Sequence, residues 1–313
     1  MLNADFYNFT QQVQGALYSA LFAGQNKLRE PLPPLPPMFQ IRAGYAESPG
    51  WFMVQALEFD PEPLTVANLR VRDIYASERI VAALLELLAG EQWLRRQGEA
   101  YHLTDAGRDT LNQVRSRTLK LLEVMETPLP AEQLNRLESL LSRVIDSSLG
   151  AGDPPGNWCL AHSRNRAPDN DAPPLLKLNQ YFSDLNAFRD DAHMAAWKAC
   201  DVGGYAWEAF TLICDGQAGT ADDVYDKLPF RGYSVAEYEK ALQTMLERGW
   251  LDHPSVQAGQ YRITEAGQAI RNNVETLTDE YFYKPWSSLS PNDLEETQQL
   301  LNLLHDRSQS MAN

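Results

Sequence analysis

One segment of the sequence carries a dense set of polar side chains at helical spacing. Asn186, Arg189, Asp190, His193 and Trp197 recur at intervals of three and four residues, so they share one face of an expected helix. A carboxylate and an imidazole placed in this way suit a polar ligand or the edge of a metal site. The alternative is a solvated face on which Arg189 pairs with an acid and His193 packs between domains. We expect these five residues to bind a small molecule in a cleft between two units.

Other patterns with chemical potential are incomplete. Cys159 and His162 have the spacing of half a zinc site, but no second pair of ligands follows nearby. Cys200 and Cys214 lie on apolar segments, which suits free thiols in a reducing compartment. The sequence contains no Gly-rich phosphate loop and no nucleophile-elbow or metalloprotease motif. We therefore expect no catalytic residue, no metal and no cofactor, and the sequence assigns no reaction.

The elements that must position these residues occur twice. Residues 93–111 read WLRRQGEAYHLTDAGRDTL, and residues 250–270 read WLDHPSVQAGQYRITEAGQAI. From Tyr101 and Tyr261 onward the two copies keep one offset without a gap. Upstream the offset changes, because the second copy has a longer loop. An internal repeat of this length indicates a duplicated domain rather than a solenoid.

Apolar periodicity and capping residues predict the same elements in each copy. The first copy is expected to contain helices at 4–24, 50–60 and 131–147, helices capped by Thr65 and Ser77, a wing at 95–104 and a long helix from Asp105. The helix after Ser77 is expected to bury Ile80, Val81, Leu84, Leu85 and Leu88. In the second copy the caps are Thr220 and Ser234, and the matching buried face is Tyr238, Leu242 and Met245. The prolines at 31–37 predict an extended arm that packs on its own protein or docks on an SH3-type groove.

Three helices, a two-stranded wing and long closing helices resemble the MarR-like winged helix-turn-helix regulators. The resemblance covers about 50–148 and 200–308 and is carried by Tyr-x-Leu-Thr-Asp-Ala-Gly at 101–107 and its counterpart at 261–267. It implies a mainly α fold with small β-wings, in which terminal helices of two units intertwine. Helices 4–24, 131–147, 176–199 and 292–306 would supply them within one chain, so we expect a monomer that forms an internal pseudo-dimer.

The domain boundaries follow from the repeat and from composition. We expect an N-terminal winged-helix unit at 1–148, a linker at 149–175 that is rich in Pro, Gly, Asp and Asn, and a C-terminal unit at 176–313. The N-terminus does not have the pattern of a signal peptide, and no run of apolar residues is long enough to cross a membrane. We therefore expect a cytoplasmic protein without a membrane partner.

The charge is unevenly distributed. The net charge is −15, with −4 in residues 1–150 and −11 in residues 151–313, which disfavours general nucleic-acid binding. Residues 70–120 are an exception, with a net charge of +2. The candidate contacts to double-stranded DNA are Arg70, Arg72, Ser77, Arg79, Arg95 and Arg96. The corresponding wing of the second copy has no Arg, and the Asp-x-Arg wing signature of MarR-like proteins is absent from both copies.

Two functions remain open at this point. The resemblance implies a ligand-responsive, DNA-binding transcription regulator that acts through its N-terminal unit. The alternative is a winged-helix scaffold that has lost DNA binding and holds a small molecule or a protein partner, with catalysis near His193 as a further option. The acidic charge and the acidic second recognition helix favour the scaffold, whereas the basic segment 70–120 favours the regulator.

Overall fold

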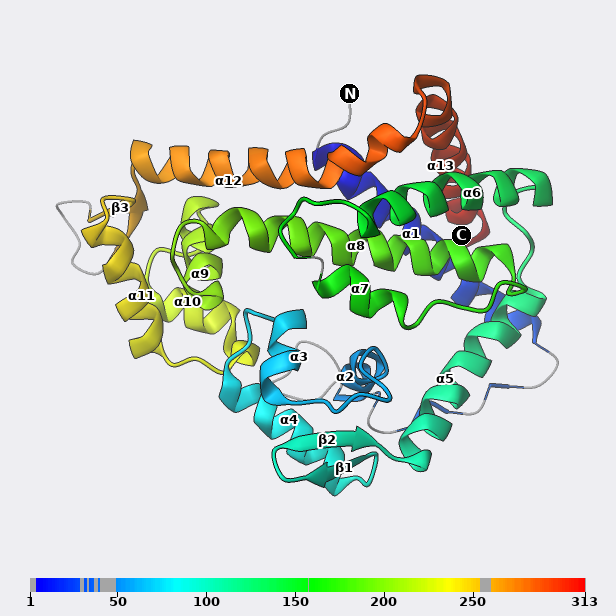
Figure 1. The fold of residues 1–313 in the computed structure, drawn as a ribbon, viewed down its shortest axis with the longest axis horizontal. Coiled ribbons are helices and arrows are strands. Elements are labelled where there is room, and N and C mark those ends of the chain that lie inside the picture. The colour runs from blue at the N-terminus through cyan, green and yellow to red at the C-terminus, as the bar shows by residue number, and fades with distance from the viewer. Residues whose placement is uncertain are drawn as a thin grey trace. The chain divides into compact units, whose positions relative to one another are not determined.

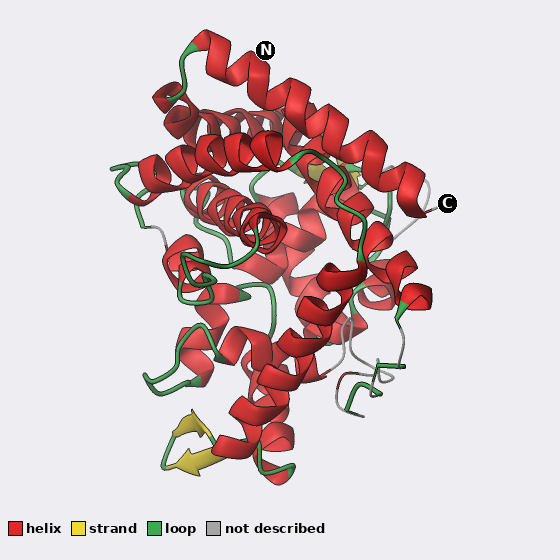
Figure 2. Ribbon diagram, turned by 90° about the vertical axis from the view of Figure 1, so that its right-hand side faces the viewer, coloured by secondary structure: helices red, strands yellow, loops and turns green. Residues whose placement is uncertain are grey.

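The structure of the protein is a computed structural model, which describes residues 4–28, 31–32, 34–36, 39, 49–156, 158–253 and 260–312. Within these residues the chain is mainly helical, and its strands form two small antiparallel sheets (Figure 2). This confirms the expected mainly α fold with small β-wings.

Contacts divide the chain into two compact units that do not follow its sequence halves. Unit 1 consists of residues 1–36, 108–192 and 279–313, and unit 2 consists of residues 37–107 and 193–278. Each unit therefore contains residues from both copies of the repeat. The boundaries predicted at 148 and 176 follow the sequence repeat and stay a prediction.

Unit 1 is a helical bundle. Its helices are α1 (Ala4–Ala23), most of α5 (Asp105–Val124), α6 (Ala131–Leu149), α7 (Trp158–Arg164), most of α8 (Pro174–Lys198), the end of α12 (Glu265–Tyr283) and α13 (Pro291–Ala312), with short 3-10 turns at Gly24–Lys27 and Lys284–Ser288. The first of these helices, α1, packs along α13, the last (Figure 1). Their apolar stripes, which include Val13, Leu17, Leu301 and Leu304, are buried in one core. Leu32 of the proline-rich arm also packs against this core. Pro33 and Pro37 of the arm lie outside the described residues.

Two buried carboxylates fix α7 to α8. The carboxylate of Asp191 accepts the backbone N–H groups of Cys159 and Leu160, both at 2.9 Å. Asp184, which is fully buried, accepts hydrogen bonds from Ser163 Oγ at 2.8 Å and from Arg164 Nη1 at 2.7 Å. These bonds compensate the cost of burying two charges and orient a helix that is too short to be stable alone.

Unit 2 contains the same series of elements twice. The first series is α2 (Pro49–Ala56), α3 (Val66–Arg72), α4 (Glu78–Gly90), β1 (Leu94–Gln97) and β2 (Ala100–Leu103). The second is α9 (Gly204–Cys214), α10 (Ala221–Lys227), a 3-10 turn at Pro229–Arg231, α11 (Val235–Glu247), β3 (Leu251–Asp252) and β4 (Arg262–Ile263). Helices α3 and α10 have 7 residues each, and α4 and α11 have 13 each. Each series is therefore a helix-turn-helix followed by a wing.

The four predicted N-caps are confirmed. Thr65, Ser77, Thr220 and Ser234 each accept the backbone N–H of the third helical residue through the side-chain oxygen. Val81, Leu84, Leu85 and Leu88 of α4 are buried as predicted, and so are Tyr238, Leu242 and Met245 of α11. The prediction for Ile80 was wrong, because this side chain is only half-buried. It lies on the flank of α4 that receives Gly232.

The repeated Thr-x-Ala-Gly sequence closes each wing onto the helix that follows. Thr104 Oγ1 donates to the carbonyl of Trp93 at 3.1 Å and accepts the N–H of Gly107 at 3.0 Å. Thr264, Trp250 and Gly267 make the same two bonds at the same distances. A Cβ at Gly107 would lie 2.5 Å from the Trp93 carbonyl oxygen, so the glycine is required by close backbone packing.

The two wings differ in extent. Strand β1 pairs with β2 from Leu94–Leu103 to Gln97–Ala100, whereas β3 and β4 pair at Leu251–Ile263 and Asp252–Arg262. Most of the longer loop expected in the second wing, residues 254–259, lies outside the described residues.

Candidate nucleic-acid interface

The exposed faces of the two recognition helices are not basic. In helix-turn-helix proteins the second helix of the motif enters the major groove, and its N-terminal residues contact base edges. On α4 the exposed residues are Glu78, Arg79, Ala83, Glu86 and Gly90. On α11 they are Ala236, Glu239, Lys240, Gln243 and Glu247. Each face thus carries one cation and two carboxylates, so it offers few donors to an acidic duplex.

Arg70 and Arg72 make contacts that hold the first helix-turn-helix together. Arg72 Nε donates to Glu58 Oε2 at 2.8 Å, and that carboxylate is completely buried. Arg70 donates to Glu78 Oε1 at 2.9 Å and to the carbonyl of Ala76 at 3.1 Å. Both predicted DNA contacts therefore have structural partners.

Ser77 and Arg79 stand at the N-terminal end of α4 and contact the second helix-turn-helix. Ser77 is buried, and its backbone N–H donates to the carbonyl of Arg231 at 2.8 Å. Arg79 Nη2 donates to the carbonyl of Gly232 and to Glu237 Oε2, both at 2.7 Å. The hydrogen bond from Arg79, with help from the Ser234 backbone N–H, lowers the pKa of Glu237 to about 2. The end of α4 that a major groove would receive is thus engaged within the protein.

The wing arginines have different surroundings. Arg96 donates to Glu86 Oε1 at 2.5 Å and to the carbonyl of Gly98 at 2.8 Å, and it lies over the ring of Tyr101. Arg95 is exposed, and no partner for it is found among the described residues. Of the candidate cations, Arg95 is therefore the one best placed to meet a phosphate.

Arg231 was not among the predicted site residues, although it is the centre of the contact between the two helix-turn-helix motifs. Its Nη2 donates to Glu208 Oε1 at 2.7 Å, and its Nη1 donates to Asp73 Oδ1 at 3.0 Å. Its guanidinium also lies over the rings of Tyr75 and Phe230. Burial works against the charge of Arg231, but Asp73 and Glu208 outweigh it and raise its pKa. Burial raises the pKa of the Glu208 carboxyl despite the bond from Arg231.

The signal that could have located this contact is a glycine. Gly232 occupies the repeat position that Tyr75 holds in the first copy, two residues before the N-cap. Its φ of +74° favours glycine, and its missing side chain indicates a close approach of another segment.

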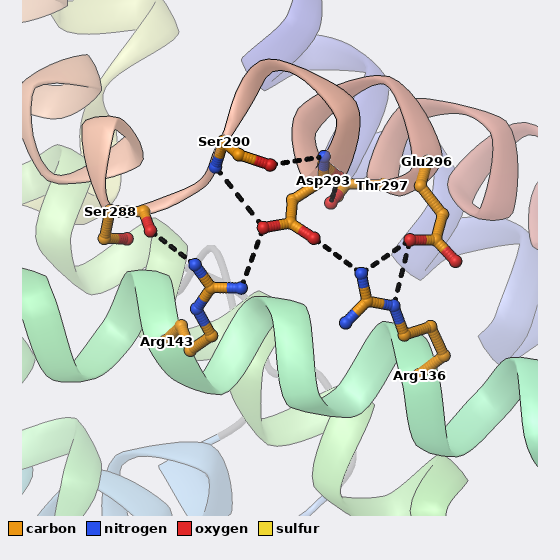
Figure 3. Close-up of polar contacts among 7 residues, drawn as sticks. All are labelled: Arg136, Arg143, Ser288, Ser290, Asp293, Glu296 and Thr297. Atoms are coloured by element: carbon orange, nitrogen blue, oxygen red, sulfur yellow. Dashed lines mark hydrogen bonds and ion pairs between the residues drawn. The ribbon is translucent and has the colours of Figure 1, made fainter.

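A second polar cluster joins α6 to α13 in unit 1 (Figure 3). Arg136 donates to Glu296 Oε2 through Nε at 2.9 Å and through Nη2 at 2.6 Å, and Nη2 also donates to Asp293 Oδ1 at 2.6 Å. Arg143 donates to Asp293 Oδ2 at 3.0 Å and to the carbonyl of Ser288 at 2.5 Å. Arg143, followed by Arg136, holds the pKa of the Asp293 carboxyl well below its usual range. In the register of the repeat, Glu296 is the counterpart of Arg136.

Three residues of the predicted ligand site belong to unit 1. Asn186 bonds to Gln11 and to Gln14 on α1. Arg189 donates to Asp279 Oδ1 at 2.5 Å and lies over the rings of Tyr7 and Phe282. Asp190 is exposed. The contacts of Asn186 and Arg189 therefore fasten α8 to its neighbours in the bundle.

The other two residues of that set belong to unit 2. His193 Nε2 accepts a hydrogen bond from Trp207 Nε1 at 3.3 Å, and Nδ1 lies 3.3 Å from Thr278 Oγ1. Trp197 is buried, stacks on Trp207 with ring centroids 6.5 Å apart, and also contacts Tyr75. The structure thus places the five predicted residues in two different units, with aromatic or polar protein partners for most of them.

The described residues contain no group of three or more His, Cys, Asp or Glu side chains arranged to hold a metal ion. Cys159, half of the incomplete zinc motif, is fully buried, with its N–H bonded to Asp191. None of the described helices is long and apolar enough to cross a membrane.

The helix-turn-helix geometry of the second half has a counterpart among known proteins. Residues 160–311 match the model of a helix-turn-helix family. The second half of the chain is therefore of the helix-turn-helix type. No curated protein and no solved structure matches it. The matched segment contains α10, α11 and the second wing, and helix-turn-helix domains of this kind are in general the DNA-binding part of regulators.

Proposed function

We propose that the protein is a DNA-binding transcription regulator of MarR-like type that acts through the helix-turn-helix and wing of its first half. The observation that carries this proposal is the double series of elements in unit 2, in which helices of 7 and 13 residues are followed by a two-stranded wing. A regulator dimer presents two helix-turn-helix motifs, one from each chain, whereas this protein has two such motifs in a single chain.

The contact between Arg136 and Glu296 supports an internal pseudo-dimer. When two equivalent units are related by a two-fold axis, only positions close to the axis meet their own counterparts. Arg136 and Glu296 occupy corresponding positions of the repeat and are joined by two hydrogen bonds. The duplication therefore replaces a homodimer, and the chain acts as a monomer.

The test is binding to a mixed-sequence duplex, measured by fluorescence anisotropy at low and high salt. Each phosphate contact contributes roughly one unit to the slope of log affinity against log salt. Arg95→Gln removes an exposed cation that has no partner among the described residues, and it should weaken binding and reduce that slope by about one. Arg307→Gln, which removes an exposed cation of α13 in unit 1, is the matched control and should leave binding unchanged. Failure of every form of the protein to bind DNA at low salt would overturn the proposal.

The rival function is a winged-helix scaffold that binds no DNA. It is favoured by the partners of Arg70, Arg72, Arg79 and Arg96, each of which bonds to a carboxylate. The salt experiment separates the two functions, because a scaffold shows no salt-dependent DNA affinity.

Ligand responsiveness is a separate part of the proposal. Because Trp197 is buried, a small molecule would act on the unit 2 part of this helix face through His193, which is more accessible. His193→Gln should change the ligand's effect on DNA affinity while the fold, followed by circular dichroism, stays intact. An unchanged ligand effect would remove His193 from the regulatory site.

A further inference from the structure

We propose that the turn formed by residues 228–234 is an autoinhibitory latch that docks on the N-terminal end of α4 and withholds it from a DNA duplex. The inference rests on the proposed function and names the regulation of the same site. The turn connects α10 to α11, so it is the turn of the second helix-turn-helix. The first recognition helix is thus held by the second motif.

Backbone atoms make the first part of the contact. The N–H groups at the start of a helix have no acceptor within that helix. At the start of α4, the Ser77 N–H donates instead to the Arg231 carbonyl at 2.8 Å. Arg79, the exposed cation nearest this end, is held by the Gly232 carbonyl and by Glu237. A helix end of this kind is where base-contacting and phosphate-contacting groups of a recognition helix lie. These donors already have partners, so a duplex must displace the turn before it can use them.

Ion pairs and ring contacts keep the turn in place. Arg231 bridges Glu208 of α9 and Asp73, which follows α3, and its side chain is 19% exposed. Tyr233 Oη donates to the carbonyl of Ala76 at 3.4 Å, and the Tyr233 ring stacks on Tyr205 with centroids 4.3 Å apart. Two side chains of the turn, Arg231 and Tyr233, therefore hold it in place, so the contact does not depend on a single surface ion pair.

Gly232 allows the two motifs to approach this closely. A Cβ at this position would lie 2.5 Å from Ser77 Oγ and 2.9 Å from Ile80 Cβ, both on the first helix-turn-helix. Real Cβ atoms essentially never make contacts under 3.0 Å, so any side chain here must push the turn away from α4. A single methyl group at position 232 should therefore separate the turn from α4.

Gly232→Ala is the test, and Gly249→Ala is its matched control. Both glycines have left-handed backbones, with φ of +74° and +72°, so both substitutions introduce the same kind of backbone strain. A Cβ at Gly249 meets no atom within 4 Å, so the control has the strain without the close contact. A difference between the two variants therefore reports the latch contact alone.

Two measurements are made on each full-length variant. The first is hydrogen exchange of the Ser77 amide, whose acceptor is in the turn; we expect exchange about tenfold faster in Gly232→Ala than in the wild type or in Gly249→Ala. The second is affinity for a mixed-sequence duplex at low salt. Since apparent affinity scales with the fraction of open molecules, it should rise by about the same factor in Gly232→Ala only.

Arg231→Gln provides a second variant in case Gly232→Ala does not fold. It keeps a polar side chain, adds no Cβ at the contact and removes the bonds to Glu208 and Asp73. Faster Ser77 exchange together with tighter DNA binding in either latch variant would support the proposal.

Three results would overturn it, and they are distinguishable. If Ser77 exchange is equal in Gly232→Ala and Gly249→Ala, or if the wild type binds DNA as tightly as the latch variants, the turn is not a latch, although the regulator remains. If exchange accelerates but no variant binds DNA, the proposed function fails and the autoinhibitory role fails with it.

Discussion

Gly267→Ala should destabilise the second winged helix, although alanine normally stabilises a helix. Gly267 is the third residue of α12, where the change from glycine to alanine is ordinarily worth about 1 kcal/mol of stability. A Cβ at this position, however, would lie 2.1 Å from the Trp250 carbonyl oxygen and 2.9 Å from its carbonyl carbon. Because both atoms belong to the backbone, a side-chain rotation cannot relieve the contact.

The size of the stability loss follows from the hydrogen bonds that the Trp250 carbonyl loses when it moves. The Trp250 carbonyl oxygen has to move from 2.1 Å to at least 3.4 Å from the new Cβ to reach an ordinary van der Waals separation. That movement weakens its bonds from Thr264 N and Thr264 Oγ1, at 3.0 and 3.1 Å, each worth about 1 kcal/mol. Overpacking adds about 1–3 kcal/mol. After subtraction of the helix preference, we expect a net loss of about 2–4 kcal/mol.

The assay is urea unfolding followed by circular dichroism, together with hydrogen exchange of the Thr264 amide. Gly90→Ala is the control, because Gly90 ends α4 and a Cβ there meets no atom within 4 Å. We expect a lower urea midpoint and faster Thr264 exchange for Gly267→Ala, and an equal or higher midpoint for Gly90→Ala. An unchanged or raised midpoint for Gly267→Ala would refute the packing argument.

Three further predictions concern charged groups. Arg72→Ala removes the ion pair between Arg72 and the fully buried carboxylate of Glu58. The free energy of unfolding measured in urea should fall by about 3–5 kcal/mol and recover in part when Glu58→Gln is added; an equal loss in both variants would contradict this. The pKa of Glu237 is lowered to about 2, so the stability that its ionised carboxylate contributes is present above the usual pKa of 4.5 and is lost as pH falls toward 2. The difference in urea midpoint between wild type and Glu237→Gln should therefore shrink between pH 4.5 and pH 2. A constant difference would count against the Arg79 bond. A double-mutant cycle of Arg136→Ala and Glu296→Ala should give a coupling free energy of about 0.5–1 kcal/mol, because both side chains are partly exposed; strict additivity would exclude the contact in solution.

Local features of the fold could be predicted from the sequence because their causes are local. Thr65 and Thr220 cap short helices through bonds to residues three positions away, and the wing follows from alternation and turn residues. The repeat alone shows only which segments are equivalent. The expectation that terminal helices of both copies share a core came from the resemblance to MarR-like proteins, and residues of α1, α6, α8 and α13 do lie in one core.

The partners of the predicted site residues could not be read from the sequence. Arg79 was expected to face DNA because it is a cation on the exposed side of a recognition helix, yet its partner Glu237 is 158 residues away in the chain. Trp197 was expected on the wall of a ligand site because of its helical spacing, but it packs against Tyr75, which lies far away in the sequence. Helical periodicity identifies which residues share a face, whereas the neighbour of that face depends on tertiary contacts.

The packing of α1 along α13 also has a consequence for synthesis of the chain. The apolar stripe of α1 leaves the ribosome well before α13, which packs along it. Completion of unit 1 therefore has to wait for α13, and a nascent chain exposes the part of α1 that α13 covers until α13 has emerged. Contacts of such long sequence separation also slow folding after release. A chain stopped after α12 would leave the part of α1 that faces α13 uncovered, which makes it a target for chaperones and proteases.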